Sequence, residues 1–294
     1  MSVDAERLRA GDVELAYESF GSRTDQPLVL VMGLGTQMIA WPDAFCEELA
    51  GAGLFVVRFD NRDCGLSTHL AGVPAPTPAQ ALLRLKRPPY SIDDMARDTL
   101  GLLDAMEFAT VDLVGASMGG FIAQAVALRA PHRLRTLTLM MTSTGSLRVG
   151  RPRVRTVAKL MRRAVAVGRE AVEDAAVATW GLIGSAGYAF DEPYIREIAG
   201  RCYDRGLDAA GTARQLAACL AQPDRTHALH ALAVPTLVIH GLDDPLVSPT
   251  GGLALARAIP RARFVGYHGL GHDLPRQLWR ELAHLIAEHS RTPR

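Results

Sequence analysis

The chain of 294 residues predicts an α/β fold, in which a mostly parallel, doubly wound sheet carries an inserted helical cap. Short apolar runs alternate with helix-like segments along most of the chain, which is typical of a sheet covered by helices on both faces. Between residues 142 and 231 the strand-like runs stop and helical periodicity replaces them. One strand-like run breaks at Gly-x-Ser-x-Gly, a pattern that indicates a sharp strand-to-helix turn.

Each element of the sheet has its own signal in the sequence. Gly11 and Asp12 separate two strand-like runs and favour a hairpin turn. Ser91 and Asp94 form a Ser-x-x-Asp box, which starts a helix whose apolar face packs on the sheet. That face consists of Ile92, Met95, Leu100 and Leu103. The expected strands cover residues 8–10, 13–20, 28–32, 55–60, 111–116, 134–141, 234–241 and 262–267, and the helices between the early strands cover about 42–50 and 91–106.

The most informative segment is the apolar run from residue 111, which breaks at Gly115-Ala116-Ser117-Met118-Gly119 and continues into a helix. A serine hydroxyl is a poor nucleophile unless a sharp turn presents it beside a base and an oxyanion hole. Gly115 and Gly119 give the clearance for that turn, because a Cβ would collide where strand and helix cross. Ser117 is therefore the predicted nucleophile.

The acid and the base are expected downstream, in the order Ser, Asp, His. Asp244 follows the buried run 234–241, and Pro245 biases it to an extended backbone at the loop exit. His272 stands in Gly269-Leu270-Gly271-His272, a glycine-rich loop after the next strand and before a final helix. We predict Asp244 as the acid and His272 as the base.

Neighbouring residues compete for these roles. Asp243 directly precedes Asp244 and is interpreted as a turn residue that binds local backbone amides. His268 and His240 stand near the same strand ends, where a histidine is more often a structural group than a base. The other histidines lack a glycine-rich loop and are interpreted as surface or helix residues: His69, His132, His227, His230, His284 and His289.

Two backbone N–H groups are expected to form the oxyanion hole. Met118 supplies the first, because it directly follows Ser117. Leu34 supplies the second, since Gly33 and Gly35 on either side let the loop turn its amide toward the pocket.

The chain divides into a core at residues 1–143, a helical cap at 144–230 and the second part of the core at 231–294. An amphipathic helix is expected over 151–163, and we interpret its basic side as a solvated outer face rather than a site for anionic substrates or membranes. An insert at 69–89, rich in Pro and Ala, is expected to flank the pocket mouth. The basic side of the expected helix consists of Arg151, Arg155, Lys159 and Arg162, and its apolar residues are Val154, Ala158, Met161 and Val165.

Composition excludes several classes of function. The formal net charge of +1 gives no electrostatic footprint for nucleic acid. No apolar run reaches the roughly 18 residues of a transmembrane helix, and the first residues lack a signal core, so we expect a cytoplasmic protein. We expect no cofactor and no metal, and the oligomeric state stays open. Four cysteines without metal-ligand spacing are expected to be free thiols: Cys46, Cys64, Cys202 and Cys219.

Several segments carry a resemblance to a known family: Leu30-Val31-Met32-Gly33, Trp41-Pro42-Asp43-Ala44-Phe45, residues 58–67, Ser117-Met118-Gly119, Asp244-Pro245 and Gly269-Leu270-Gly271-His272. Over about residues 10–143 and 230–290 the chain resembles the α/β-hydrolase superfamily, and within it the aclacinomycin methylesterase type of actinobacterial serine hydrolases. The resemblance implies an eight-stranded sheet, a Ser117, Asp244, His272 triad and an oxyanion hole from Leu34 and Met118.

Departures from related patterns narrow this resemblance. Gly35-Thr36 stands where cofactor-free perhydrolases place a proline, and Ser117 stands where haloalkane dehalogenases and epoxide hydrolases use aspartate. Met32-Gly33 replaces the His-Gly of many relatives, as in the methylesterase type. The loop Asp60-Asn61-Arg62-Asp63 is expected to be structural, through charge-assisted bonds to backbone.

The expected activity is hydrolysis of a carboxylic ester through an acyl-enzyme, on a hydrophobic small molecule such as the methyl ester of a bulky, polyketide-like acid. A lactonase, a thioesterase, a carbon–carbon bond hydrolase and a non-hydrolytic tailoring enzyme or binding protein are the alternatives. The combination of elbow serine, acid and base disfavours a pure binding protein, which needs none of them.

Overall fold

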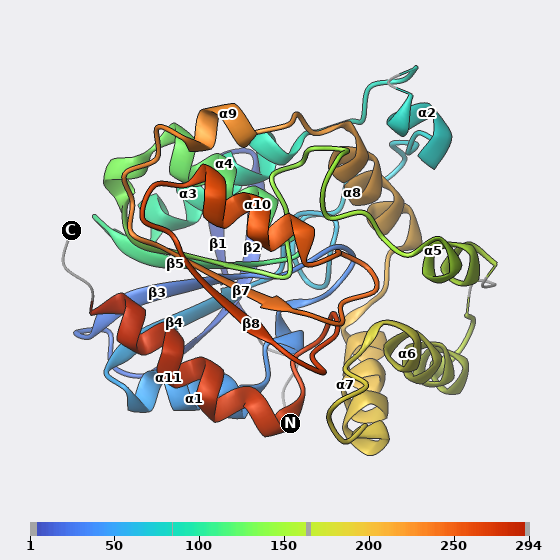
Figure 1. Cartoon of the computed structure of the whole chain (residues 1–294). Helices are drawn as coiled ribbons and strands as arrows, with labels where there is room; N and C mark the ends of the chain where they lie inside the picture. The colour runs from blue at the N-terminus through green and yellow to red at the C-terminus, as the bar shows by residue number, and fades with distance from the viewer. Residues whose placement is uncertain (1–4, 84, 163–165, 292–294) are drawn as a thin grey trace.

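The apolar runs pair into one eight-stranded sheet, with the strand order β1-β2-β4-β3-β5-β6-β7-β8 (Figure 1). The pairs β1–β2 and β2–β4 are antiparallel, and all other neighbours are parallel. The computed structural model describes residues 5–83, 85–162 and 166–291. The mostly parallel α/β sheet that the sequence predicts is confirmed. The strands are β1 Glu6–Ala10, β2 Val13–Phe20, β3 Gln26–Val31, β4 Leu54–Phe59, β5 Val111–Ala116, β6 Leu134–Met140, β7 Thr236–Gly241 and β8 Arg263–Tyr267.

The middle of the sheet is apolar because helices cover both of its faces. Every residue of β4, β5 and β7 is buried. Helices α1 and α11 pack on one face, and α3, α4 and α10 on the other (Figure 1). These helices are α1 Asp43–Gly51, α3 Ile92–Ala105, α4 Met118–Arg129, α10 Thr250–Ala258 and α11 Trp279–Ser290. Short 3₁₀ helices precede α1 at Met38–Ala40, follow α4 at Pro131–Arg133 and precede α11 at Arg276–Leu278.

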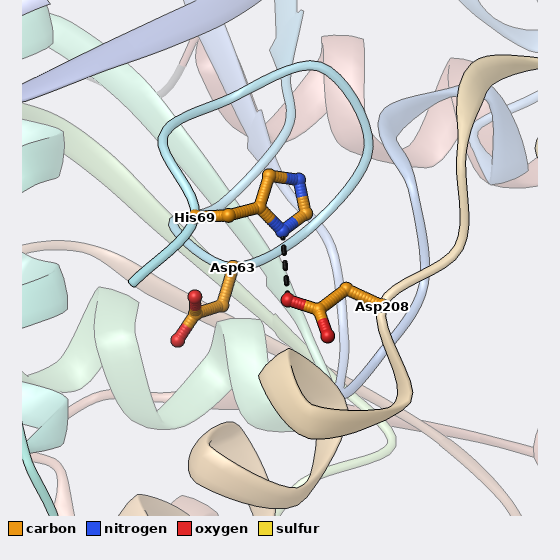
Figure 2. Close-up of side chains that lie close together, drawn as sticks. All are labelled: Asp63, His69 and Asp208. Atoms are coloured by element: carbon orange, nitrogen blue, oxygen red, sulfur yellow. Dashed lines mark hydrogen bonds and ion pairs between the residues drawn. The ribbon is translucent and has the colours of Figure 1, made fainter. Parts of the chain in front are cut away.

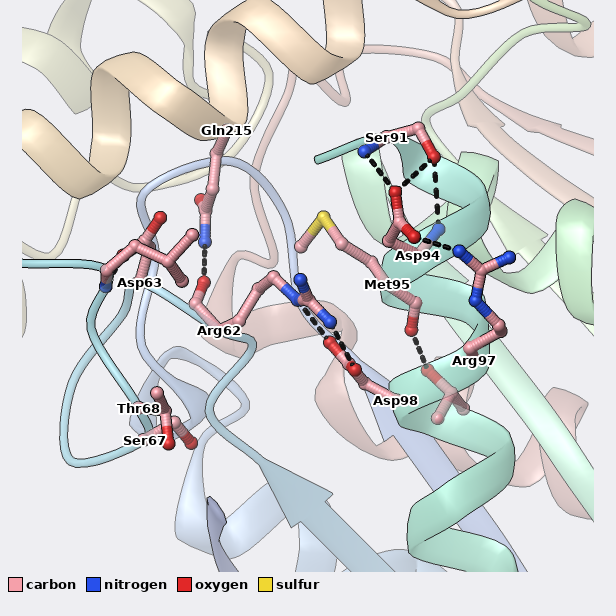
Figure 3. Close-up of polar contacts among 12 residues, drawn as sticks. Arg62, Asp63, Ser67, Thr68, Ser91, Asp94, Met95, Arg97, Asp98 and Gln215 are labelled. Atoms are coloured by element: carbon pink, nitrogen blue, oxygen red, sulfur yellow. Dashed lines mark hydrogen bonds and ion pairs between the residues drawn. The ribbon is translucent and has the colours of Figure 1, made fainter. Parts of the chain in front are cut away.

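Helix α3 begins at the predicted cap. The Asp94 amide donates to Ser91 Oγ at 3.2 Å, and the Ser91 amide donates to Asp94 Oδ2 at 2.7 Å (Figure 3). Ile92, Met95 and Leu103 of the predicted apolar face are buried as expected, whereas Leu100 is only half-buried. Figure 3 also shows the Arg62 guanidinium on the Asp98 carboxylate, with both contacts at 2.5 Å. This ion pair ties α3 to the loop after β4.

Between β6 and β7 the described residues contain no strand, as the sequence predicts. Whether residues 144–230 behave as a separate domain stays a prediction. Helix α5 is shorter than the expected 151–163, because Arg153 is extended and caps it, and Val165 lies outside the described residues. The inserted segment, residues 142–235, contains α5 Val154–Met161, α6 Arg169–Ile183, α7 Glu192–Arg205, α8 Ala209–Ala221 and α9 Thr226–Leu229.

The insert at 69–89 lies against the inserted segment. It contains α2 (Pro78–Leu82), which begins with a capping box at Thr77 and packs on α8. Among the described residues, no helix is both long and apolar enough to cross a membrane.

Candidate active site

The turn at Ser117 joins β5 to α4 through a very close crossing. A Cβ on Gly115 would lie 2.3 Å from the Gly119 carbonyl oxygen, and a Cβ on Gly119 would lie 2.1 Å from the Val31 carbonyl oxygen. Only glycine fits at either position. Ser117 itself has φ of +55°, a left-handed conformation that a non-glycine residue adopts only where its surroundings hold it. The turn therefore places the Ser117 side chain beyond the carboxyl end of β5, where it lines a cavity.

The three residues predicted as nucleophile, acid and base lie in one hydrogen-bonded chain. His272 Nε2 lies 3.0 Å from Ser117 Oγ, and His272 Nδ1 lies 2.7 Å from Asp244 Oδ2. The other Asp244 oxygen, Oδ1, accepts from the Leu246 and Val247 amides at 2.8 Å each. With Asp244 Oδ1 so occupied, Oδ2 faces the imidazole, and the arrangement places a proton on Nδ1 and leaves Nε2 to accept from Ser117.

Asp243, the alternative candidate for the acid, binds the loop before His272 rather than the backbone next to itself. Asp243 Oδ2 accepts from the Gly269 amide at 2.7 Å, and the Asp243 amide donates to the Leu270 carbonyl oxygen at 3.1 Å. Asp243 lies in a turn, as expected, but its carboxylate binds the amide of a residue 26 positions away rather than a local one. Its carboxylate instead fixes the loop that leads to His272.

The two competing histidines lie in different surroundings. His240 is buried and its Nε2 lies 2.8 Å from the Val247 carbonyl oxygen, while His268 is exposed. Burial lowers the pKa of His240, because the charged imidazolium is disfavoured there. Among the described residues, neither His240 nor His268 forms a hydrogen bond with Ser117, whereas His272 does.

The Leu34 loop faces Ser117 from the end of β3. A Cβ on Gly33 would lie 3.2 Å from Ser117 Cβ, and Gly35 has φ of +62°. The Gly35 amide donates to Gln215 Oε1 at 2.8 Å, and Gln215 Nε2 donates to the Arg62 carbonyl oxygen at 2.7 Å (Figure 3). Gln215 of α8 thus holds the loop in place. The Met118 amide opens α4, where a helical N–H has no intrahelical partner.

The loop that carries His272 is also bound to the inserted segment. The His272 amide donates to the Ile183 carbonyl oxygen at 2.8 Å, and the Gly271 amide donates to Ser185 Oγ at 2.9 Å. Ser185 in turn donates to Asp273 through its amide, at 3.2 Å, and through its hydroxyl. Burial raises the pKa of Asp273 although these hydrogen bonds favour the carboxylate. The sequence analysis did not identify Ser185 or Asp273. The only signal in the sequence was that Asp273 directly follows His272.

A cavity of about 450 Å³ opens in front of Ser117 and His272. Its walls are mainly apolar and come largely from α6 and α7 of the inserted segment, together with the Leu34 loop. At its rim Arg276 pairs with Asp191 at 2.8 Å. No described residue of the insert at 69–89 lines the cavity, so the expectation that this insert flanks the pocket mouth is wrong. The side chains of α6 and α7 that line the cavity include Val172, Ala176, Trp180, Tyr194 and Ile198.

The loop at residues 60–63 is structural, as expected. Asp60 Oδ1 accepts from the Met38 amide at 2.7 Å, and Asp63 Oδ1 accepts from the Leu70 amide at 2.7 Å. Both carboxylates also bind arginines of the inserted segment, which sequence reasoning did not anticipate. Arg205 contacts Asp60 at 2.5 Å, and Arg214 contacts both Asp63 oxygens at 2.8 Å.

Three of the groups near this loop have the composition of a metal site. Ligand atoms of Asp63, His69 and Asp208 all lie within 4.8 Å of one another (Figure 2). The Arg214 guanidinium already binds Asp63 on both oxygens and reaches Asp208 at 3.1 Å. A cation would compete with this buried guanidinium, so the cluster is better described as an ion-pair network. His69 is partly exposed, and it also joins the loop after β4 to Asp208, a contact that the interpretation as a surface or helix residue did not include.

This network makes the stability of the protein depend on pH through His69. Burial opposes protonation of His69, but hydrogen bonds to the Gly65 carbonyl oxygen and the Asp208 carboxylate, both at 2.9 Å, raise its pKa. The pKa values of Asp63 and Asp208 are lowered, because their hydrogen bonds outweigh the effect of burial. A raised histidine pKa stabilises the fold below the ordinary value of about 6.5, and this contribution disappears as pH rises through the raised value.

We therefore predict that His69→Gln lowers the Tm more at about pH 6 than at about pH 8. Thermal unfolding of both proteins at the two pH values measures the difference. His268→Gln removes an exposed imidazole and serves as the control. A loss of Tm that is equal at both pH values, or larger at the higher one, would contradict the assigned role of His69.

The comparisons with known proteins agree with this geometry. Residues 26–275 match the family described as alpha/beta hydrolase fold. The chain is 32% identical to the rhodomycin D methylesterase of Streptomyces sp. (strain C5) and 30% identical to that of Streptomyces peucetius, with 95% of this chain and 96% of each relative covered. The enol-lactonase of Burkholderia xenovorans LB400 matches with a TM-score of 0.74 and 26% identity, over 97% of this chain and 99% of the other. The chain belongs to the α/β hydrolase fold family.

Proposed function

We propose that this protein is a serine hydrolase that cleaves a carboxylic ester through an acyl-enzyme. The observation that carries the proposal is the hydrogen-bonded chain from Ser117 Oγ through His272 to Asp244, which lies at the wall of an apolar cavity. Family membership supports a hydrolase, and the two methylesterase relatives support an ester as the substrate. In the proposal Ser117 is the nucleophile, His272 the general base and Asp244 the acid.

In the first step His272 Nε2 takes the proton from Ser117 Oγ as this oxygen attacks the ester carbonyl carbon. The carbonyl oxygen becomes an oxyanion, which accepts hydrogen bonds from the Leu34 and Met118 amides. Asp244 stabilises the imidazolium through Nδ1. His272 then gives its proton to the alkoxy oxygen, the carbon–oxygen bond breaks, and the alcohol leaves an acyl group on Ser117.

In the second step a water molecule replaces the alcohol. His272 takes a proton from the water as the hydroxyl oxygen attacks the acyl carbon, and the same two amides hold the oxyanion. The bond to Ser117 breaks, and His272 returns the proton to Ser117 Oγ. The carboxylic acid leaves and the enzyme is restored.

We further propose that residues 144–230 act as a cap that selects a hydrophobic acyl group. The side chains of α6 and α7 that line the cavity include Val172, Trp180, Tyr194 and Ile198, which offer mostly apolar contact area. Such walls favour a large acyl portion, and the relatives that act on rhodomycin D are named as methylesterases. A methyl ester of a bulky, polyketide-like acid is the proposed substrate class.

The cysteines indicate where the enzyme is located. Cys46, Cys64, Cys202 and Cys219 are all free thiols. Free thiols persist in a reducing compartment, and the cytoplasm is the proposed location.

The assignment of the acid can be tested with a matched pair of variants. Asp244→Asn should lower kcat by about 10⁴-fold, because a neutral amide no longer favours the imidazole tautomer that the base needs. Asp243→Asn should cost less than about tenfold, since its amide oxygen can still accept from Gly269. Steady-state hydrolysis of an activated ester measures both, with Ser117→Ala as the inactive reference. The opposite ranking would move the acid to Asp243, and a Ser117→Ala variant with wild-type turnover would overturn the serine mechanism.

The proposed substrate class predicts how kcat/KM depends on the size of the acyl group. A bulky, multi-ring methyl ester should give a higher kcat/KM than short activated esters such as acetates, because binding energy from the remote acyl group is used in the transition state. Trp180→Ala should lower kcat/KM roughly tenfold for the bulky ester and leave the acetate almost unchanged. A steady fall in kcat/KM with acyl size would indicate a short-chain esterase. A preference for lactones over both esters would indicate a lactonase.

A further inference from the structure

The segment at residues 147–168 is cationic and contains no acidic residue. It is also free of aromatic residues. Several of its large apolar side chains are nevertheless exposed, with Val154 at 83% and Met161 at 67% of their full surface. The basic residues of the segment are Arg148, Arg151, Arg153, Arg155, Lys159, Arg162 and Arg163.

Helix α5 explains why apolar side chains are exposed here. Successive residues of a helix are about 100° apart, so its eight residues separate into distinct faces. The face toward the protein carries Thr156, which is buried, and Leu160, which is half-buried. The apolar face, with Val154, Val157 and Met161, points elsewhere and is exposed.

The basic residues lie beside this exposed apolar face. Arg155 and Lys159 are one helical turn apart and both are exposed. Within the described part of the chain, no carboxylate forms an ion pair with either residue. The neighbouring Arg169 differs, since it pairs with Glu173 at 3.0 Å and with Asp204 at 2.5 Å. The sequence analysis predicted a solvated basic face on this helix. It did not predict that the apolar residues of the helix are exposed to solvent as well.

Helix α5 is held at the edge of the inserted segment rather than in the core. The Arg153 amide donates to the Pro245 carbonyl oxygen at 2.9 Å, which fixes the start of the helix. Figure 1 shows α5 at the right edge of the molecule, above α6 and away from the sheet. Helix α5 contacts α6, and α6 lines the cavity through Val172, Ala176 and Trp180, so α5 neighbours an element that bounds the proposed acyl site.

We propose that the α5 surface, made of Val154, Arg155, Val157, Lys159 and Met161, binds the surface of an anionic lipid bilayer. A helix with an exposed apolar face and a polar face rich in lysine and arginine can lie in the membrane interface, with the apolar face in the acyl boundary and the cations at the headgroups. The proposal is independent of the reaction that Ser117 carries out. Bound in this way, the protein would hold its apolar cavity near the phase in which hydrophobic esters dissolve.

Other occupants fit this surface less well. A second copy of the chain would place the same cations against each other in a two-fold interface, and like charges repel. Nucleic acid binding would draw on aromatic stacking or a strongly basic domain, whereas this segment has no aromatic residue and the chain has a net charge of +1. An acidic protein remains an outcome of the test.

The test is cosedimentation of the full chain with vesicles of phosphatidylcholine alone or mixed with phosphatidylglycerol. The protein should bind the anionic vesicles, with an affinity that falls as salt rises, and bind the neutral vesicles far more weakly. Arg155→Glu with Lys159→Glu should weaken binding at least about 30-fold, since each cation contributes close to a fivefold factor. Val154→Ser with Met161→Ser should weaken it about tenfold or more, because the apolar insertion is lost.

The control is Arg257→Glu with Arg280→Glu, which reverses the same number of charges at exposed positions of α10 and α11. It should bind within about threefold of wild type, because screening limits the influence of distant charges. Failure of the wild type to bind anionic vesicles at low salt would overturn the proposal, as would a control that loses as much as the Arg155 and Lys159 variant. Unchanged binding by the Val154 and Met161 variant, or binding to polyglutamate as tight as to vesicles, would instead indicate an acidic protein partner and also overturn it.

Discussion

The close crossing of β5 and α4 is the constraint on which the rest of the site depends. Gly115 and Gly119 bring the strand and the helix so near that no Cβ fits between them, and Ser117 is held with a positive φ. This geometry raises the serine above the end of the sheet and directs the start of α4 toward it. The loops that follow β3, β7 and β8 bring Leu34, Asp244 and His272 to the same edge of the sheet as Ser117.

The inserted segment does more than cover this arrangement. Arg205 and Arg214 reach from α7 and α8 to Asp60 and Asp63, and Gln215 holds the Leu34 loop. Buried ion pairs gain little net stability, because each charge loses its hydration. Their directional hydrogen bonds instead set the position of the helices over the site. Ser185 of the inserted segment makes a similar contact with the loop that carries His272, because its hydroxyl oxygen accepts from the Gly271 amide.

Local patterns made much of the molecule predictable. The alternation of apolar runs and helices gave the parallel sheet, and the Ser91 cap and the Ser117 turn follow from short sequence motifs. The three triad candidates stand at strand ends, which a parallel sheet brings to one edge. Contacts across long stretches of chain left no such signal: Asp243 binds Gly269, and Arg214 binds Asp63 across 151 residues of sequence. The exposure of the apolar face of α5 also depends on which side packs against the protein, and periodicity does not determine this.

A crystal structure of the protein inactivated by an organophosphonate ester would show whether the crossing of β5 and α4 presents Ser117 to two backbone donors and one imidazole. We expect phosphorus on Ser117 Oγ, with one phosphonyl oxygen about 2.7–3.1 Å from both the Leu34 and Met118 amides. His272 Nε2 should face the ester oxygen. Phosphorus on another residue, or a phosphonyl oxygen turned away from both amides, would show that Ser117 is not presented in this way.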